Sequence, residues 1–316
     1  MRRAALIYNP ASGQQQHRRL ARVQAAAQTL EAAGIAATLI PTEAAGSAGA
    51  QAAAAVTSGH DAIFACGGDG TVNDVLQGLV AHAPDVPLGV VPLGTGNVLA
   101  FDLGIPRGPA AAIRKQLTFT PRRIAAGQIE YQGRDGNRES RYFTLGASVG
   151  PDALMLYRTH PALKKRIGIF EYFRQAVLFL LNHPYEEFQV SIAGREEKTR
   201  CSQLSTVRVT RIGNRIRYFT MDSGLHRDDF HALWVATPNL IRQGIYFLSL
   251  WGGFKWKVQG IDGMLCGELH CEVLPDQTYA HGLYAQADGE VLGGLPVTIR
   301  IVPQAFTLLM PPVTAH

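Results

Sequence analysis

The chain has 316 residues, with 30 Lys and Arg against 25 Asp and Glu, a formal net charge of +5, 47% hydrophobic residues and 17% charged residues. This composition excludes bulk disorder, and the length predicts about two domains, each large enough to bury a core without disulfides. The positive charge is spread along the chain, so we expect no nucleic acid among the partners. A basic face toward anionic lipid or a phosphate-bearing substrate accounts for the charge equally well.

The four cysteines show no CxxC spacing, and no apolar run of signal-peptide length follows the first arginines. The longest purely apolar run, Ala176 to Leu181, is far shorter than the ~20 residues that span a bilayer. We therefore expect a reduced, cytoplasmic protein with no transmembrane segment, in which Cys66 is a small buried strand residue.

The first part of the chain alternates short apolar runs with longer Ala-rich runs. Strands are predicted at 4–8, 35–40, 62–66 and 88–91, and helices at 16–33, 47–58 and 72–82. This alternation predicts a parallel sheet covered by helices, in which ligands bind at the carboxyl ends of the strands.

After Pro121 the pattern changes to many strand-like runs, which predicts an antiparallel sandwich or barrel. One amphipathic helix with a basic flank is predicted between Pro161 and His183. We place the domain boundaries at 1–122, 123–302 and 303–316, the last being a tail that returns to the first domain or stays apart. The predicted strands of the second part are 124–131, 141–148, 186–193, 203–210, 230–237, 268–274 and 297–302.

Three predicted strands of the first part end in loops built from small residues, at 9–13, 66–75 and 92–97. Such loops present backbone N–H groups at the positive ends of helices, where anions bind. The glycines around Asp69 let phosphate oxygens approach the backbone, and the carboxylate can hold a metal ion or a water. No cation lies between Gly67 and Gly70 or between Gly94 and Asn97, so a bound triphosphate would need Mg²⁺ and basic residues from elsewhere.

A fourth segment, Gln286-Ala287-Asp288-Gly289-Glu290, is typical of a hairpin turn, and its spacing alone favours a plain turn.

Together, the segments NPASG, GGDGTVNDVLQGL and PLGTGNVLAFDLGIP resemble the diacylglycerol kinase catalytic domain shared by lipid kinases, sphingosine kinases and bacterial relatives. The resemblance extends to FTLGASVGPDA at 143–153 and to QADGE followed by PVTIRIVPQAFTLLMP. GGDGT alone is shared with NAD kinases. The resemblance implies an α/β N-terminal domain with a parallel sheet, of the NAD kinase and diacylglycerol kinase type, and a β-rich antiparallel sandwich as C-terminal domain.

The resemblance also implies an ATP-dependent kinase that phosphorylates a lipid hydroxyl, with ATP and Mg²⁺ as cofactors. Residues 1–122 would bind the nucleotide and 123–302 the lipid. Asp288 would be the base that activates the hydroxyl, with Glu290 in support; Asp69 is the rival base and the ligand of a catalytic Mg²⁺. The implied nucleotide contacts are Asn9, Ser12, Gly13, Gly67, Gly68, Asp69, Gly70, Thr71, Asn73, Gly94, Thr95 and Asn97.

The chain departs from the family pattern at several positions. Asp74 stands where Glu is common, and Val98 stands where many relatives carry Asp. The family also implies a structural Mg²⁺ at Asp228 and Asp229, but the glycine that follows in relatives is Phe230 here, which argues against that metal.

The lipid acceptor is expected to be diacylglycerol-like or sphingoid-like. The helix at 161–183 and the aromatic cluster at 246–256 suit peripheral contact with an anionic membrane, although an ordinary core role explains both at least as well. A homodimer is compatible with the sequence. Two other functions stay open: an NAD kinase-like small-molecule kinase, and a catalytically weak regulatory relative that binds lipid or nucleotide, which Val98 makes conceivable.

Overall fold

The computed structural model describes residues 1–10, 16–133, 135–151, 153, 185–209, 211, 212, 216, 217, 224–252, 257–276, 279 and 283–312. The helix predicted between Pro161 and His183 lies outside the described residues. The chain divides into two compact units. Unit 1 contains Met1–Ala126, Arg211–Asn214 and Val302–His316, and unit 2 contains Gly127–Thr210 and Arg215–Ile301.

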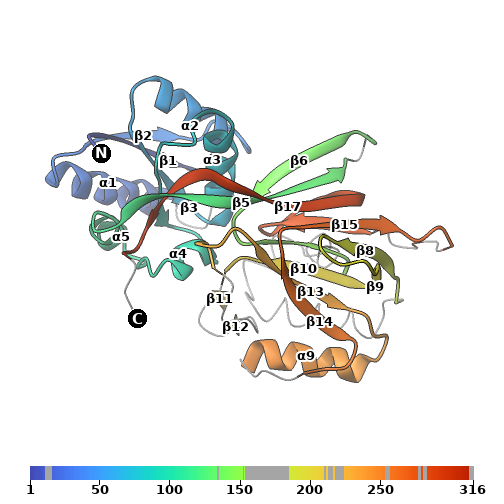
Figure 1. Cartoon of the computed structure of the whole chain (residues 1–316). Helices are drawn as coiled ribbons and strands as arrows, with labels where there is room; N and C mark the ends of the chain where they lie inside the picture. The colour runs from blue at the N-terminus through green and yellow to red at the C-terminus, as the bar shows by residue number, and fades with distance from the viewer. Residues whose placement is uncertain are drawn as a thin grey trace. The chain divides into compact units, whose positions relative to one another are not determined.

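Unit 1 is built on a parallel sheet in the order β2 (Ala36–Pro41), β1 (Arg3–Tyr8), β3 (Ala62–Gly67), β4 (Leu88–Pro92) (Figure 1). Every residue of β3 and β4 is buried, as expected for strands covered on both faces. The far end of β17 (Glu290–Met310) adds to this sheet next to β4, where Leu308 pairs with Leu88 in parallel. The predicted parallel α/β sheet is confirmed.

The helices of unit 1 are α1 (Gln16–Ala32), α2 (Ala48–Thr57), α3 (Asp69–His82), α4 (Val98–Asp102) and α5 (Pro109–Gln116). Helix α2 packs against α3 and α1 against α5, and the two pairs lie on opposite sides of strands β1 to β3 (Figure 1). Helices α2 and α3 come very close, because a Cβ on Gly78 would lie 2.0 Å from the carbonyl oxygen of Gly49. The short helices α4 and α5 had not been predicted.

Unit 2 is antiparallel and rich in β-strands. One run of strands has the order β14 (Ile261–Cys266), β13 (Phe230–Val235), β10 (Gln203–Val207), β7 (Gly146–Val149), β16 (Tyr284–Ala287), β17. From β17 a second run continues on one side through β15 (Glu268–Val273), β8 (Phe188–Ile192) and β9 (Thr199–Cys201), and on the other through β5 (Thr120–Gln132) and β6 (Arg138–Phe143).

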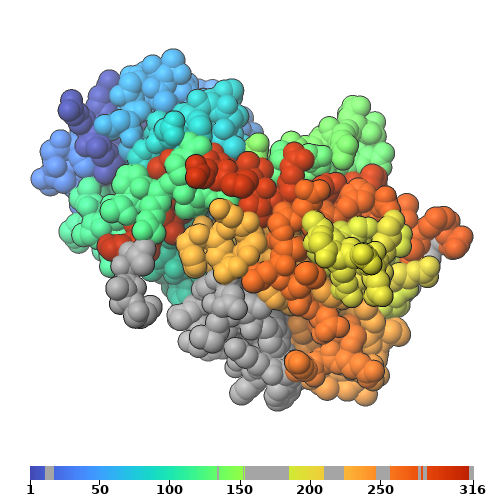
Figure 2. All heavy atoms as spheres, in the orientation of Figure 1, coloured from blue at the N-terminus to red at the C-terminus, as the bar shows by residue number. Residues whose placement is uncertain are grey.

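Buried side chains from both runs form one core, which includes Phe143, Val149, Phe188, Phe230 and Val297. The turn between β5 and β6 is exposed and stands out from the surface of unit 2 (Figure 2). The prediction of a β-rich antiparallel second half is therefore confirmed.

Several predicted elements of unit 2 have other bounds in the structure. The strand predicted at 141–148 is two strands, β6 and β7, which are interrupted at Thr144 and Leu145. The strand predicted at 297–302 is the middle of the long strand β17. The aromatic stretch after residue 240 contains a helix, α9 (Leu240–Gly252), that had not been predicted. Two short strands complete the described elements: β11 (Arg211–Ile212), which belongs to unit 1, and β12 (Ile216–Arg217), which belongs to unit 2.

The four cysteines are all free and buried, as predicted for Cys66. Burial raises the pKa of the Cys66 thiol and, for Cys266, raises it to about 12. Within the described part of the chain, no helix has the length and apolar content to cross a bilayer.

Candidate functional site

Three loops of small residues follow β1, β3 and β4, which are neighbours in the parallel sheet of unit 1. Because parallel neighbours point the same way, their carboxyl ends lie at one edge. Of the first loop, Asn9 is described and half-buried, whereas Ser12 and Gly13 lie outside the described residues. The backbone carbonyl of Asn9 accepts a hydrogen bond from Nη1 of Arg19 on α1 at 3.3 Å.

The second loop leads from β3 directly into α3. The N-cap residue of α3 is Gly68, in an extended conformation. As a glycine, it has no side chain to cap the helix. The first N–H groups of an α-helix, here those of Gly70 and Thr71, lie before the point where the helix's own carbonyls can bind them. A Cβ on Gly70 would meet no atom within 4 Å, so the backbone there faces open space. This helix end carries partial positive charge and suits an anion.

The other two predicted contacts in this segment, Thr71 and Asn73, have structural neighbours. The Thr71 side chain packs on Gly67, where an added Cβ would lie 2.4 Å from the Thr71 hydroxyl oxygen. Asn73 is 4% exposed, and its side-chain oxygen accepts a hydrogen bond from Gln77 at 3.0 Å. Of this segment, the part that faces outward is therefore the turn at Gly68 to Gly70.

The third loop is held by its own asparagine. The Asn97 side chain donates to the carbonyl of Gly94 at 2.6 Å and accepts from the N–H of Gly94 at 2.9 Å. Asn97 is buried and adopts a left-handed conformation, with φ of 51°. Gly94 lies against the second loop, because an added Cβ would lie 2.5 Å from the Cα of Gly68. Thr95 and Gly96 are exposed at the tip of the loop.

The carboxylate of Asp69 lies beneath this third loop. Its Oδ1 is 3.4 Å from the backbone N of Leu99, and a Cβ on Gly96 would lie 2.8 Å from its Oδ2. Asp69 was expected in an exposed loop, but it is the half-buried first residue of α3. The structure thus brings Asp69, Gly68, Gly94 and Gly96 together at one edge of the sheet.

In unit 2, Asp288 occupies the turn between β16 and β17, with φ of 49°. Its Oδ1 accepts from the N–H groups of Leu145 at 2.8 Å and Gly146 at 3.1 Å. Its Oδ2 accepts from the N–H of Thr144 at 2.9 Å and from the Thr144 hydroxyl at 3.2 Å. The carboxylate therefore holds the turn that separates β6 from β7.

Glu290, the predicted supporting acid, forms an ion pair with Arg141 of β6 at 2.6 Å, and its side chain is 52% exposed.

At the structural metal site that the resemblance implies, one of the two carboxylates is already engaged by an arginine. Both carboxylate oxygens of Asp229 accept from the guanidinium of Arg227, at 2.7 Å and 2.6 Å. Asp228 is exposed. Among the described residues, no group of three or more His, Cys, Asp or Glu is placed to hold a metal ion.

A comparison with protein families finds a match for the part of the chain that contains the three loops. Residues 3–129 match the family model of the diacylglycerol kinase catalytic domain. The sequence of this segment is therefore similar to that of a diacylglycerol kinase catalytic domain. The family resemblance seen in its loop motifs is thereby confirmed.

Curated relatives support the same family. A diacylglycerol kinase of Staphylococcus saprophyticus subsp. saprophyticus is 33% identical over 173 residues, which are 54% of this chain and 53% of the relative. A diacylglycerol kinase of Staphylococcus aureus (strain bovine RF122 / ET3-1) is 34% identical over 173 residues, 54% of this chain and 51% of the relative. The match thus spans about half the length of these relatives.

The fold extends further than these sequence matches. The crystal structure of a diacylglycerol kinase from Bacillus anthracis str. Sterne aligns with a TM-score of 0.75 and 18% identity, covering 99% of this chain and 98% of the other. This likeness shows a shared fold along the chain.

Two arginines near these groups were missed by the sequence reasoning. Arg19 of α1 lies beside the first loop, where it donates to the carbonyl of Asn9. Burial lowers the pKa of Arg19, and the neighbouring Arg22 adds to that shift. Arg208, after β10, is 0% exposed. A signal for Arg208 existed, because Leu204, Thr206 and Arg208 share one face of an alternating strand, and that face is buried.

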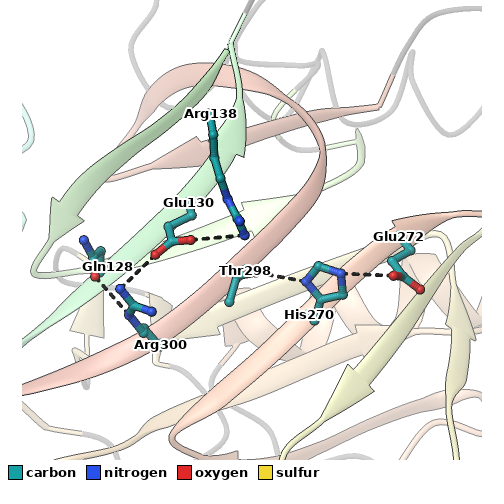
Figure 3. A network of polar contacts seen from close by, with 7 residues as sticks. All are labelled: Gln128, Glu130, Arg138, His270, Glu272, Thr298 and Arg300. Carbon is teal, nitrogen blue, oxygen red and sulfur yellow. Dashed lines mark hydrogen bonds and ion pairs between the residues drawn. The ribbon is translucent and has the colours of Figure 1, made fainter. Parts of the chain in front are cut away.

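A further polar network lies on β5, β6, β15 and β17 within unit 2 (Figure 3). Glu130 pairs with Arg300 at 2.8 Å and with Arg138 at 3.2 Å. His270 contacts Thr298 at 2.9 Å and Glu272 at 3.2 Å. Except for His270 and Glu272, which are both on β15, these pairs join neighbouring strands, which is typical of sheet stabilisation.

Proposed function

We propose that this chain is an ATP-dependent lipid kinase, which transfers the γ-phosphate of ATP to a hydroxyl of a diacylglycerol-like or sphingoid-like lipid. The proposal rests on the open, glycine-built start of helix α3. There, Gly68 caps the helix without a side chain and Gly70 faces open space, within a segment that matches the diacylglycerol kinase catalytic domain.

Unit 1 supplies the residues that would hold the triphosphate. The N–H groups of Gly70 and Thr71 would donate to phosphate oxygens, and Thr95 would add a hydroxyl from the exposed tip of the third loop. The close approach of Gly94 to Gly68 keeps the two loops within reach of one anion. Arg19, next to the first loop, would balance part of the charge.

Asp69 fits the chemistry of a magnesium ligand. Mg²⁺ in kinases is commonly held by one or two carboxylates together with phosphate oxygens and water. The Asp69 carboxylate is half-buried at the edge where the phosphates would lie, with Gly96 leaving room beside its Oδ2. When bound, the ion would neutralise charge on the phosphates during transfer.

Asp288 and Asp69 both remain candidates for the base. A carboxylate has about four acceptor positions, and at least four hydrogen bonds from described residues reach Asp288. The longest of these four is that of the Thr144 hydroxyl, at 3.2 Å, and a hydroxyl can rotate away and leave Oδ2 to a lipid hydroxyl. For Asp288 to act as base, we therefore propose that the acceptor hydroxyl takes the place of the Thr144 hydroxyl.

The transfer itself is an in-line displacement. The lipid oxygen forms a bond to the γ-phosphorus as the bond from that phosphorus to the β,γ-bridging oxygen breaks. The hydroxyl proton passes to the carboxylate base, and ADP leaves with the bridging oxygen. The chain's contribution is positioning and charge balance, because no covalent intermediate with the protein is needed.

Contact with an anionic membrane is part of the proposal. Helix α9 begins with Leu240 and Ile241, which are 48% and 75% exposed, and the chain carries a net charge of +5. Apolar side chains that enter the interface and a positive surface together favour binding to anionic lipid. A homodimer stays a prediction, as does the lack of nucleic acid among the partners.

The decisive experiment offers γ-³²P-labelled ATP with Mg²⁺ and a total lipid extract, followed by identification of the labelled lipid. The protein with its original sequence is compared with the Asp69→Ala variant and with Asp85→Ala, a matched surface control. The proposal is supported if the original protein and Asp85→Ala produce labelled lipid and Asp69→Ala does not. Label that appears in NADP, with NAD present and no lipid, would support an NAD kinase-like enzyme instead.

A catalytically weak relative is the other outcome. Val98, the first residue of α4, follows directly on Asn97, so a carboxylate present at this place in many relatives is missing beside the third loop. ATP binding without transfer to any lipid or to NAD would favour this alternative.

A further inference from the structure

The side chain of Gln116, the last residue of α5, is 1% exposed and contacts strand β4. Its Oε1 accepts from the N–H of Val90 at 2.8 Å, and its Nε2 donates to the carbonyl of Val90 at 2.7 Å. The same Nε2 lies 3.1 Å from the carbonyl of Ala112, one turn earlier in α5. The amide thus satisfies both backbone groups of one strand residue, as a neighbouring strand would.

Strand β17 stops short of Val90. It pairs with β4 in parallel, with Leu308 opposite Leu88. Val90 faces the same edge of β4 as Leu88, and in this register its carbonyl would need the N–H of residue 311. Residue 311 is a proline, which has no backbone N–H, and β17 ends immediately before it. The side chain from α5 therefore supplies bonds that the sheet cannot.

Val90 is close to the third loop of the candidate site. The next residue of β4 on this edge is Pro92, which has no N–H either, so Val90 is the last residue of β4 that can form both bonds there. On the opposite edge, the N–H of Leu93 donates to the carbonyl of Gly67 at 2.9 Å. The start of the third loop is thus anchored to β3 on one edge and, through Val90, to α5 on the other.

Glutamine is the side chain that this contact requires. An amide both accepts and donates, whereas an ionised carboxylate only accepts. Val90 is 2% exposed, so its N–H and carbonyl are costly to leave without a partner. Without the amide, the carboxyl end of β4 has to move until water or another group reaches Val90, and the third loop moves with it.

We propose that Gln116 is a positioning residue, which fixes the carboxyl end of β4 and holds the third loop against the second. The third loop places Gly94 against Gly68 and covers the carboxylate of Asp69. A shift of this loop therefore changes the surface that meets the triphosphate. The step from loop position to ATP binding rests on the proposed function.

A first experiment requires no catalytic activity. Amide hydrogen exchange is followed in peptides that cover residues 93–99, without nucleotide. Gln116→Met keeps an unbranched side chain of similar length and removes both bonds to Val90. We expect exchange in these peptides to rise about tenfold or more, while peptides from β2 exchange as in the original protein.

Thr307→Val is the matched control. The Thr307 hydroxyl donates to the carbonyl of Pro84 at 2.8 Å, before the amino end of β4, and Thr307 is 5% exposed. The variant loses a buried hydrogen bond of the same unit but leaves the carboxyl end of β4 intact, so exchange at 93–99 should stay unchanged. Unchanged exchange in folded Gln116→Met, or an equal rise in Thr307→Val, would overturn the positioning role.

Gln116→Glu provides a second variant if Gln116→Met does not fold. A protonated carboxyl group can both accept from and donate to Val90, whereas the ionised group cannot donate. We expect exchange at 93–99, relative to the original protein at the same pH, to be faster at pH 8.5 than at pH 5.5. A ratio that is the same at both pH values would contradict the proposal.

A third measurement links the loop to ATP. Binding of ATP with Mg²⁺ is measured by titration calorimetry without lipid. We expect the Kd of Gln116→Met to be about tenfold higher than that of the original protein, and that of Thr307→Val to stay within twofold. A structural role alone would lower the stability of both variants without this difference.

Faster exchange with an unchanged Kd would overturn the step from loop position to ATP binding. If the original protein itself binds no ATP, the proposed function fails, while the exchange experiments still test the role of Gln116.

Discussion

The candidate site of unit 1 and the Asp288 turn of unit 2 hold a carboxylate by opposite means. Around Asp69, the loops are shaped by glycines whose missing side chains let backbones meet, as at Gly94 and Gly68. Around Asp288, position is set by hydrogen bonds that backbone N–H groups and a hydroxyl donate to the carboxylate. The first site should therefore tolerate no added volume where loops touch, and the second should tolerate no change of charge.

The largest effect is expected from Asp69→Ala. If Asp69 holds the metal or the acceptor, lipid phosphorylation should fall at least a hundredfold. The fold should persist, because Asp69 is half-buried at the start of α3 and its neighbours are mostly glycine.

The measurement is the rate of lipid phosphorylation together with the far-UV circular dichroism spectrum. The control is Asp85→Ala, which removes an exposed ion pair with Arg123 and should keep full activity. Retention of a tenth of the original rate by folded Asp69→Ala would refute the assignment.

Asp288→Asn tests the charge of the second site. Asn tolerates the left-handed backbone, but its NH₂ group would face N–H donors that now meet a carboxylate oxygen. We expect stability to fall by about 1–3 kcal/mol. If Asp288 is also the base, kcat should fall about a hundredfold or more with little change in nucleotide affinity.

Denaturant unfolding and steady-state kinetics at a temperature where the variant is folded separate these two effects. Asp135→Asn is the matched control, since Asp135 also accepts hydrogen bonds within a turn of unit 2 but is exposed. Near-normal kcat in folded Asp288→Asn would give the base role to Asp69 and leave Asp288 as the anchor of the 144–146 turn.

Two glycine variants test whether the loops of unit 1 tolerate an added methyl group. Gly94→Ala places a Cβ 2.5 Å from the Cα of Gly68, so we expect a loss of about 1–3 kcal/mol in stability. Gly70→Ala meets nothing within 4 Å and should fold normally. If phosphate oxygens lie over Gly70, the new methyl group should still raise the KM for ATP about tenfold, equivalent to about 1.4 kcal/mol.

Gly267→Ala in unit 2 is the control for Gly70→Ala, because a Cβ there also meets nothing within 4 Å. It should change neither the stability nor the KM for ATP. An unchanged KM for ATP in Gly70→Ala would move the phosphate site away from the start of α3.

The sequence predicted the parallel sheet and its three loops because each element is local: an apolar run, a glycine turn and a helix follow one another along the chain. It could not predict the contacts between segments far apart in sequence. The break at Thr144 and Leu145 depends on Asp288, which lies more than 140 residues later. The contact of the Arg208 side chain with the carbonyl of Arg227 likewise depends on the fold, although the position of Arg208 on a buried strand face was a usable signal.

The smallest effect is expected from Arg19→Gln. Arg19 donates to the carbonyl of Asn9 at 3.3 Å, and burial together with Arg22 lowers its pKa, so its charge is held near the first loop at some cost. A phosphate group nearby would relieve that cost. Since Arg19 is only half-buried, solvent screens the attraction, and we expect the KM for ATP to rise about threefold to tenfold, about 1 kcal/mol, with kcat nearly unchanged. Arg114→Gln, which changes an exposed arginine of α5 in the same unit, is the control for overall charge. An equal rise of KM in both variants would mean that only the net charge of unit 1 matters, and an unchanged KM in Arg19→Gln would place the balancing cation elsewhere.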